Sequence, residues 1–128
     1  MSRYLLDTGL IIQHLRGHKP TVKLLRGLGK TERLCISTIT RLEIYAGMRP
    51  HEAFNTQKLL SRFVNLDITG RIADKAGSYL ASAKAERQGL QIPDAIIAAT
   101  ATTHNLTVVT FNIVHFNDIT NLSLYPLK

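Results

Sequence analysis

Cysteine, tryptophan and acidic residues are scarce in this chain. Its 128 residues include one cysteine and no tryptophan, and 9 Asp and Glu residues stand against 16 Lys and Arg residues. A lone cysteine cannot close an internal disulfide, so Cys35 is expected to pack in the core of a protein of the reducing cytoplasm. The apolar stretch 95–99 is too short to span a bilayer, and Asp7 interrupts the first apolar run. Neither a membrane segment nor a secretory leader is therefore expected.

The shortage of acids makes the chain strongly basic. Its formal net charge is +7 and its pI is near 9.9. An excess of positive charge favours polyanionic partners, of which nucleic acid is the most common, with an acidic protein as the alternative. Basic residues are spread along the sequence, so a nucleic acid would meet a folded surface rather than a basic tail.

Short apolar segments alternate with helical patterns along the chain, and no repeat or linker interrupts them. This alternation predicts one α/β domain over residues 1–128, with a central sheet of four or five mostly parallel strands flanked by helices. The expected strands are 3–6, 34–37, 63–66, 106–109 and 122–124. The expected helices are 8–15, 21–28, 38–46, 52–62, 69–88 and 93–104, and 112–116 is expected to be a loop or short helical turn.

Three of the acids stand beside apolar segments rather than in polar surroundings. Asp7 follows the first predicted strand, Glu43 lies within a predicted helix, and Asp94 precedes the apolar run 95–99. Ligands bind beyond the carboxyl ends of the strands in open parallel sheets. We therefore expect these acids, together with Asn112 after the fourth strand, at one edge of the sheet.

Each acid also has an ordinary structural explanation. Asp7 and Asp94 could each interact with the amino end of a helix. Glu43 is harder to explain, because it shares a helix face with Ile39 and Ala46. Two carboxylates about 5 Å apart repel by roughly 3 kcal/mol at an effective dielectric near 20. A retained proton would relieve that repulsion, and so would Mg²⁺ or Mn²⁺, which prefer oxygen ligands.

Four segments, taken together, resemble the motifs of PIN-domain nucleases. They are 4–8 (YLLDT), 37–47 (STITRLEIYAG), 92–101 (IPDAIIAATA) and 108–112 (VVTFN), in the family's order, and the third is the most specific. The subgroup that they resemble is the VapC-type toxin of toxin–antitoxin modules. The resemblance implies a three-layer PIN-like fold and an endoribonuclease that depends on Mg²⁺ or Mn²⁺.

The resemblance assigns roles to single residues. Asp7, Glu43 and Asp94 match the family's three acidic metal ligands, and Asn112 stands at a fourth catalytic position that often carries an acid. An amide oxygen can bind a metal or position a water, but it adds no charge. His115 occupies a further position where Asp is frequent. These two departures leave open whether one metal ion or two are bound.

Other residues near these motifs are expected to assist. The hydroxyls of Thr8 and Thr110 are placed to orient a carboxylate or a water beside the metal. Arg41 and Lys84 are expected to hold the RNA backbone, and His115 to contact the substrate.

The resemblance also implies partners. A small antitoxin would silence the enzyme, the toxin would form a homodimer, and promoter DNA would be bound only through the antitoxin complex. Two other functions stay open. Asn112 and His115 are compatible with a PIN-like module that binds nucleic acid or protein without cleavage. The same site would also serve a metal-dependent phosphatase or a DNA-directed nuclease.

Overall fold

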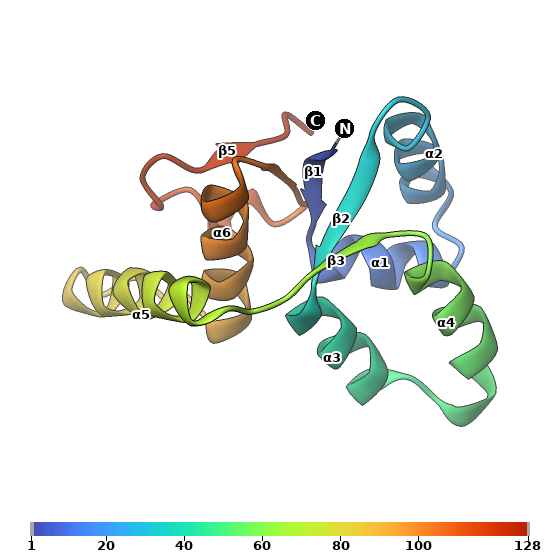
Figure 1. The fold of residues 1–128 in the computed structure, drawn as a ribbon, viewed down its shortest axis with the longest axis horizontal. Helices are drawn as coiled ribbons and strands as arrows, with labels where there is room; N and C mark the ends of the chain where they lie inside the picture. The colour runs from blue at the N-terminus through green and yellow to red at the C-terminus, as the bar shows by residue number, and fades with distance from the viewer. Residues whose placement is uncertain (1, 128) are drawn as a thin grey trace.

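The centre of the computed structural model, which describes residues 2–127, is a five-stranded sheet with the order β3-β2-β1-β4-β5 (Figure 1). Every pair of neighbouring strands is parallel. β1 (Ser2–Leu6) lies in the middle, between β2 (Arg33–Ser37) and β4 (Thr107–Val109), while β3 (Val64–Leu66) and β5 (Ser123–Leu124) form the edges. The predicted α/β fold with a mostly parallel sheet is confirmed.

Helices connect the strands and flank the sheet. They are α1 (Thr8–Leu15), α2 (Lys19–Leu28), α3 (Thr38–Gly47), α4 (Ala53–Leu60), α5 (Gly70–Ala85) and α6 (Ile92–His104), with short 3-10 turns η1 (Pro50–Glu52) and η2 (Ile113–His115). In Figure 1, α5 and α6 lie together on the left, and α1 to α4 lie on the right.

The helix starts follow local capping chemistry. Asp7, Ser37 and Thr69 precede α1, α3 and α5, and each side-chain oxygen accepts a hydrogen bond from a backbone N–H of the first turn. α2 and α6 instead carry Pro20 and Pro93 in their first turns. Both helices begin slightly earlier than predicted, because a proline in the first turn needs no partner for an N–H.

Several elements are shorter than predicted. α5 ends at Ala85 rather than at 88, and Arg87 just beyond it has a left-handed φ of 59° that no helix continues. α4 loses residues at both ends of its predicted span. The strands β3, β4 and β5 each begin one residue later than predicted.

The sheet buries both of its faces. Leu6 and Ile36 point into a core shared with α1 to α4, whereas Leu5 and Cys35 point into a core shared with α6. Cys35 is buried and unpaired, so the prediction that it packs in the core is confirmed. No helix within residues 2–127 has the length and apolarity needed to cross a bilayer.

Candidate active site

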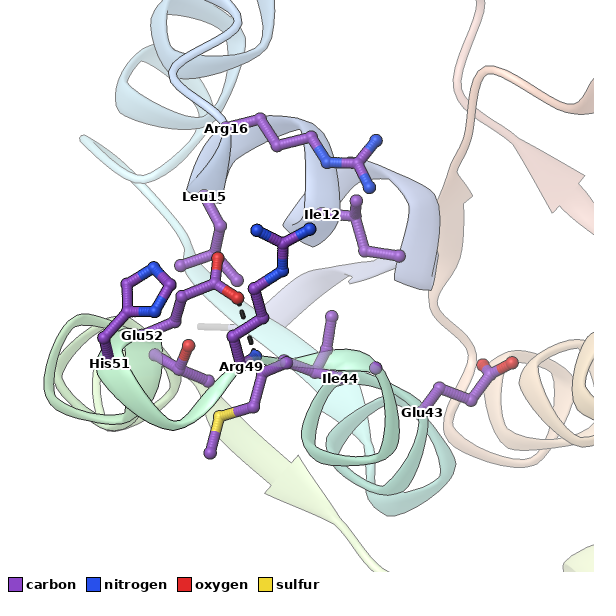
Figure 2. A pocket seen from close by; sticks show the side chains of 11 residues that line it. Ile12, Leu15, Arg16, Glu43, Ile44, Arg49, His51 and Glu52 are labelled. Atoms are coloured by element: carbon purple, nitrogen blue, oxygen red, sulfur yellow. Dashed lines mark hydrogen bonds between the residues drawn. The ribbon is translucent and has the colours of Figure 1, made fainter.

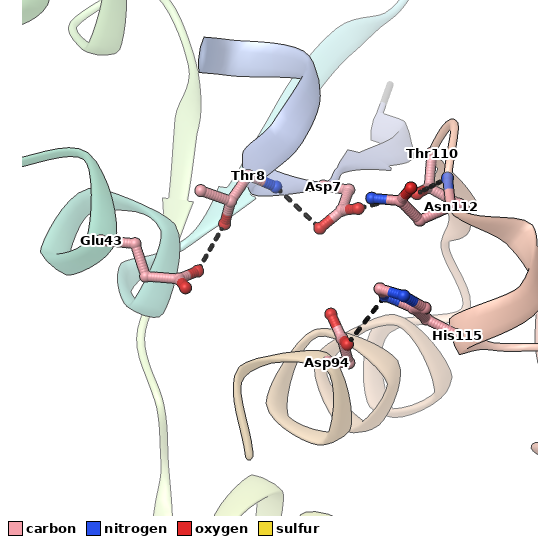
Figure 3. A network of polar contacts seen from close by, with 7 residues as sticks. All are labelled: Asp7, Thr8, Glu43, Asp94, Thr110, Asn112 and His115. Carbon is pink, nitrogen blue, oxygen red and sulfur yellow. Dashed lines mark hydrogen bonds and ion pairs between the residues drawn. The ribbon is translucent and has the colours of Figure 1, made fainter. Parts of the chain in front are cut away.

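Three carboxylates meet at the carboxyl ends of the central strands (Figure 3). Asp7 follows β1, Glu43 lies on α3, which follows β2, and Asp94 lies in the first turn of α6. Their side chains point toward a common space from three sides. We call these three residues the acidic edge. The structure thus brings together acids that are far apart in the sequence, at the edge where they were expected.

Asp7 is fixed in place by two strong hydrogen bonds. Its Oδ1 accepts from the backbone N–H of Thr8 at 2.8 Å, and its Oδ2 accepts from the Thr110 hydroxyl at 2.7 Å. Its own N–H donates to the carbonyl of Val109 at 3.0 Å. Asp7 is 5% exposed, so the carboxylate has few other orientations open to it. It acts as a helix cap and faces the other acids at the same time.

A chain of hydroxyl groups leads to Glu43. The Thr8 hydroxyl donates to Glu43 Oε1 at 2.8 Å and lies 2.9 Å from the Thr40 hydroxyl. Because the single hydroxyl hydrogen of Thr8 goes to Glu43, Thr40 donates to Thr8. Thr40 is fully buried and was not among the predicted site residues. Its only signal in the sequence is its place one helical turn before Glu43.

Asp94 pairs with a histidine from the next polar segment. Its Oδ2 lies 3.2 Å from Nδ1 of His115 in η2. The Asp94 side chain is 15% exposed, whereas that of His115 is 53% exposed. His115 therefore approaches the acidic edge from the solvent side.

Asn112 lies between Thr110 and His115 and belongs to the same network. Its backbone N–H donates to the Thr110 hydroxyl at 2.9 Å, and its carbonyl accepts from the N–H of His115 at 3.0 Å. A Cβ placed on Gly9 would lie 3.9 Å from the Asn112 side-chain nitrogen, so the amide sits over the start of α1. Figure 3 shows this amide beside Asp7.

The carboxylates of the acidic edge affect each other's protonation. Burial raises the pKa of Asp7, while hydrogen bonds from Thr110 and Thr8 and the charge of His115 oppose that rise. Burial also raises the pKa of Asp94, and the nearby charges of Asp7 and Glu43 raise it further, against the effect of His115. The repulsion expected between these acids is therefore present at Asp94.

The geometry of the acidic edge suits a hydrated divalent ion bound by one or two carboxylates better than an ion enclosed by protein ligands. Within residues 2–127, no three His, Cys, Asp or Glu side chains are close enough together to enclose an ion. Mg²⁺ usually keeps several waters and takes only one or two carboxylates. Carboxylate oxygens that face one space fit such an ion, held by one or two of them with waters completing its shell.

Of the three residues predicted to contact RNA, His115 belongs to this network, whereas Arg41 and Lys84 lie outside it. The Arg41 guanidinium donates to Asn65 Oδ1 at 3.2 Å and lies over the Tyr45 ring at 5.8 Å. Lys84 is exposed in the last turn of α5. Their roles in substrate binding stay predictions.

Glu43 also borders a groove between α1, α3 and η1 (Figure 2). The groove has a volume of about 360 Å³, and its apolar lining includes Leu15 and Ile44. Arg16 and Arg49 are among its other lining residues, and the Glu43 carboxylate points away from them. We call it the α1–α3 groove. It adjoins the acidic edge and was not predicted.

A second cavity lies at the opposite end of β2, where Arg33 begins the strand. Its volume is about 470 Å³, and Arg26, Arg62 and His14 also line it, with Glu32 as the one acid of its lining. We call it the basic cavity. Burial lowers the pKa of His14, and the charges of Arg62 and Arg26 lower it further.

Comparison with known proteins agrees with this geometry. The family model described as PIN domain matches residues 4–121. Ribonuclease VapC10 of Mycobacterium tuberculosis is 32% identical over 112 residues, which cover 88% of this chain and 84% of that protein. The crystal structure of VapBC2 from Rickettsia felis bound to a promoter DNA fragment has a TM-score of 0.85 at 25% identity, covering 95% of this chain and 96% of that chain. A toxin–antitoxin complex from Klebsiella pneumoniae has a TM-score of 0.79 at 29% identity, covering 97% and 99%. The chain therefore belongs to the PIN-domain family and, within it, to the VapC type.

Proposed function

We propose that this protein is a metal-dependent endoribonuclease toxin of a toxin–antitoxin module, working as one domain over residues 1–128. The observation that carries the proposal is the convergence of Asp7, Glu43 and Asp94 at one edge of the sheet. The relationship to a protein named as a ribonuclease supports RNA as the substrate.

The acids would hold Mg²⁺ or Mn²⁺. A divalent ion bound there would lower the pKa of a water and stabilise negative charge developing on a phosphodiester. Asp7 supplies a carboxylate that is already oriented, and Asp94 and Glu43 add charge from the other sides. Burial raises the pKa of Asp94 and the charges of Asp7 and Glu43 raise it further, and a bound ion would relieve the repulsion from those two charges.

Neighbouring polar groups keep this arrangement in place. Thr110 and Thr8 donate to Asp7 and Glu43, respectively, so each carboxylate keeps a free face toward the common space. Asn112 would position a water or a substrate oxygen with its amide. Arg41 and Lys84 would hold the RNA backbone outside the acidic edge.

We further propose that a small antitoxin protein binds and silences the enzyme. The complexes from Rickettsia felis and Klebsiella pneumoniae support such a partner. The α1–α3 groove suits it, because apolar lining residues and two arginines adjoin Glu43. The toxin would act as a homodimer, and promoter DNA would be bound only through the antitoxin complex.

The test is cleavage of RNA by the purified chain with Mg²⁺ or Mn²⁺, with and without EDTA. Asp7→Asn should lower the rate by about a thousandfold or more, because the ion loses its fixed ligand. Asp74→Asn, an exposed carboxylate on α5, is the matched control and should cleave normally. Equal cleavage by the wild-type and Asp7→Asn proteins, both with and without EDTA, would refute the mechanism.

A panel of substrates completes the test. RNA, DNA and small phosphate esters are compared at equal metal concentration, with and without the co-purified antitoxin. We expect the protein to cleave RNA but not DNA or the phosphate esters, and we expect the antitoxin to abolish that cleavage. Tight RNA binding without cleavage would indicate a binding module instead.

A further inference from the structure

We infer that a cavity beside the acidic edge receives the base of an unpaired guanosine of the RNA substrate and that Asp118 recognises this base. The cavity has a volume of about 260 Å³ and is lined by residues 88–90, which lie between α5 and α6, and by Val114, His115, Asp118 and Ile119. We call it the η2 cavity. The inference deepens the proposed ribonuclease function and rests on it.

The η2 cavity and the acidic edge share the side chain of His115. This imidazole lines the cavity, and its Nδ1 lies 3.2 Å from Asp94 Oδ2 (Figure 3). An RNA strand with a phosphate at the acidic edge would therefore bring a neighbouring base to the cavity. Proteins that read unpaired RNA stack its bases on aromatic side chains, histidine among them. The half-exposed ring of His115 provides such a surface.

The lining of the η2 cavity suits a nucleobase rather than a phosphate. Unlike the α1–α3 groove and the basic cavity, it contains no Lys or Arg. Leu90, Val114 and Ile119 give it apolar walls, and Val114 is 79% exposed. A base placed there would remove some of this apolar surface from water. The volume lies just below the range of about 300–1,000 Å³ that is typical for drug-sized ligands, so the cavity suits one flat base.

Packing holds both walls of the η2 cavity in place. On one side, Leu90 packs against a buried cluster formed by α5 and α6. On the other side, Ile119 packs against the core shared with α6, and its N–H donates to the carbonyl of Phe116 at 3.2 Å. Phe116 is 1% exposed and anchors the segment between His115 and Asp118. Such a cavity is formed before its ligand arrives, which lowers the entropic cost of binding.

Asp118 determines which base fits. It is exposed, and neither ion pair found within residues 2–127 uses its carboxylate. A carboxylate repels the RNA backbone, so its presence here favours RNA binding only if it accepts hydrogen bonds from a base. An ionised carboxylate is an acceptor only. Guanine presents two adjacent donors, N1–H and the 2-amino group, whereas each other RNA base places acceptors next to a single donor group. Guanine therefore satisfies both oxygens of Asp118.

The experiment measures binding by the full chain in EDTA, separately from cleavage. The probes are RNA tetranucleotides of uridine that carry either one guanosine or one inosine, which lacks the 2-amino group. NMR titration should show the amide signals of Leu90 and Ile119 shifting with the guanosine probe. That probe should bind the wild-type protein about tenfold more tightly than the inosine probe. Asp118→Asn replaces an acceptor by a donor and should remove this preference, whereas the control Asp74→Asn, on α5, should keep it.

The outcomes separate this inference from the proposed function. Equal affinities of the wild-type protein for the two probes would overturn the guanosine site, and so would a preference that persists in a folded Asp118→Asn protein. Cleavage of RNA with Mg²⁺ or Mn²⁺ in either of those cases would leave the nuclease intact. Preferential binding of guanosine by a protein that cuts no RNA would support the η2 cavity and refute the nuclease. Thermal unfolding establishes that each variant is folded.

Discussion

The two ends of the parallel sheet gather charges of opposite sign. At the acidic edge, burial raises the pKa of Asp7 and Asp94, and neighbouring acids raise that of Asp94 further. In the basic cavity, burial and two nearby arginines lower the pKa of His14. The shifts differ in direction because burial disfavours the charged form, which is the deprotonated form of an aspartate and the protonated form of a histidine.

This separation of charge is informative because the composition of the chain would also allow every acid to be paired with a base. With 16 basic and 9 acidic residues, it could have paired every acid with a base. The structure instead places three acids around one space and gives Asp94 a histidine as its ion-pair partner. A cluster of like charges lowers the stability of the folded protein, and such unfavourable clusters are typical of functional sites. The comparison predicts that the acidic edge responds to cations and that the basic cavity does not.

The largest expected effect is stabilisation by metal. Mn²⁺ at about a hundred times its dissociation constant should raise the free energy of unfolding by about 2.7 kcal/mol, because it binds the folded state alone. Asp7→Asn should abolish most of that gain. Arg62→Gln in the basic cavity should keep it. Urea unfolding with and without Mn²⁺ makes the measurement, and equal loss in both variants would show that the two ends are not independent.

The next effect concerns the hydroxyl that holds Asp7. Thr110→Val removes the donor to Asp7 Oδ2 and the acceptor for the Asn112 N–H, so we expect a loss of about 2 kcal/mol of stability. Thr107→Val is the matched control on β4, because its hydroxyl bonds the exposed Ser123. It should cost less than about 0.5 kcal/mol in urea unfolding. Similar losses in the two variants would contradict the role of Thr110.

Asp94→Asn should stabilise the metal-free protein by about 1 kcal/mol at neutral pH. The pKa of Asp94 is raised in the folded state above its ordinary value of 3.8, so folding is penalised once the carboxylate ionises. The penalty develops as pH rises from that value through the folded pKa and is complete above it. The gain should therefore vanish in acid. Unfolding curves across pH, with Asp74→Asn as the control, test this prediction. A gain independent of pH would argue against ionisation of the buried Asp94 carboxylate as its cause.

The smallest effect is at His14. Its pKa lies below the ordinary value of 6.5, so stability is lost as pH falls from that value through the folded pKa. Arg62→Gln should move the His14 pKa back toward 6.5, because one neighbouring charge is removed. NMR titration of the ring measures the shift. Arg49→Gln, in the α1–α3 groove, should leave it in place, and a shift of equal size there would point to net charge rather than local charge.

The sheet and the acidic edge could be predicted because their signals are local. Apolar segments and helix caps locate the strands and helices, and the rule for open parallel sheets brings Asp7, Glu43 and Asp94 to one edge. The shortened edge strands could not be foreseen, because strand ends depend on neighbours that are distant in the sequence. Likewise, nothing in a sequence shows that α5 stops at Ala85.

The hydroxyl chain and the position of His115 depend on tertiary packing. Thr40 reads as an ordinary helix residue until α3 packs beside the start of α1. His115 reads as a polar loop residue, and only the approach of η2 to α6 gives it Asp94 as a partner. The basic cavity is similar, since Arg26, Arg33 and Arg62 become neighbours only through folding.

The strand order also determines when, during synthesis, the acidic edge can be completed. β1 is made first, yet it needs β4 beside it to complete the middle of the sheet, and α6 carries the third carboxylate. A polypeptide released before α6 would carry Asp7 and Glu43 without Asp94. The proposed nuclease would therefore lack a complete acidic edge until α6 and β4 had been synthesised, so the chain would gain activity only late in translation.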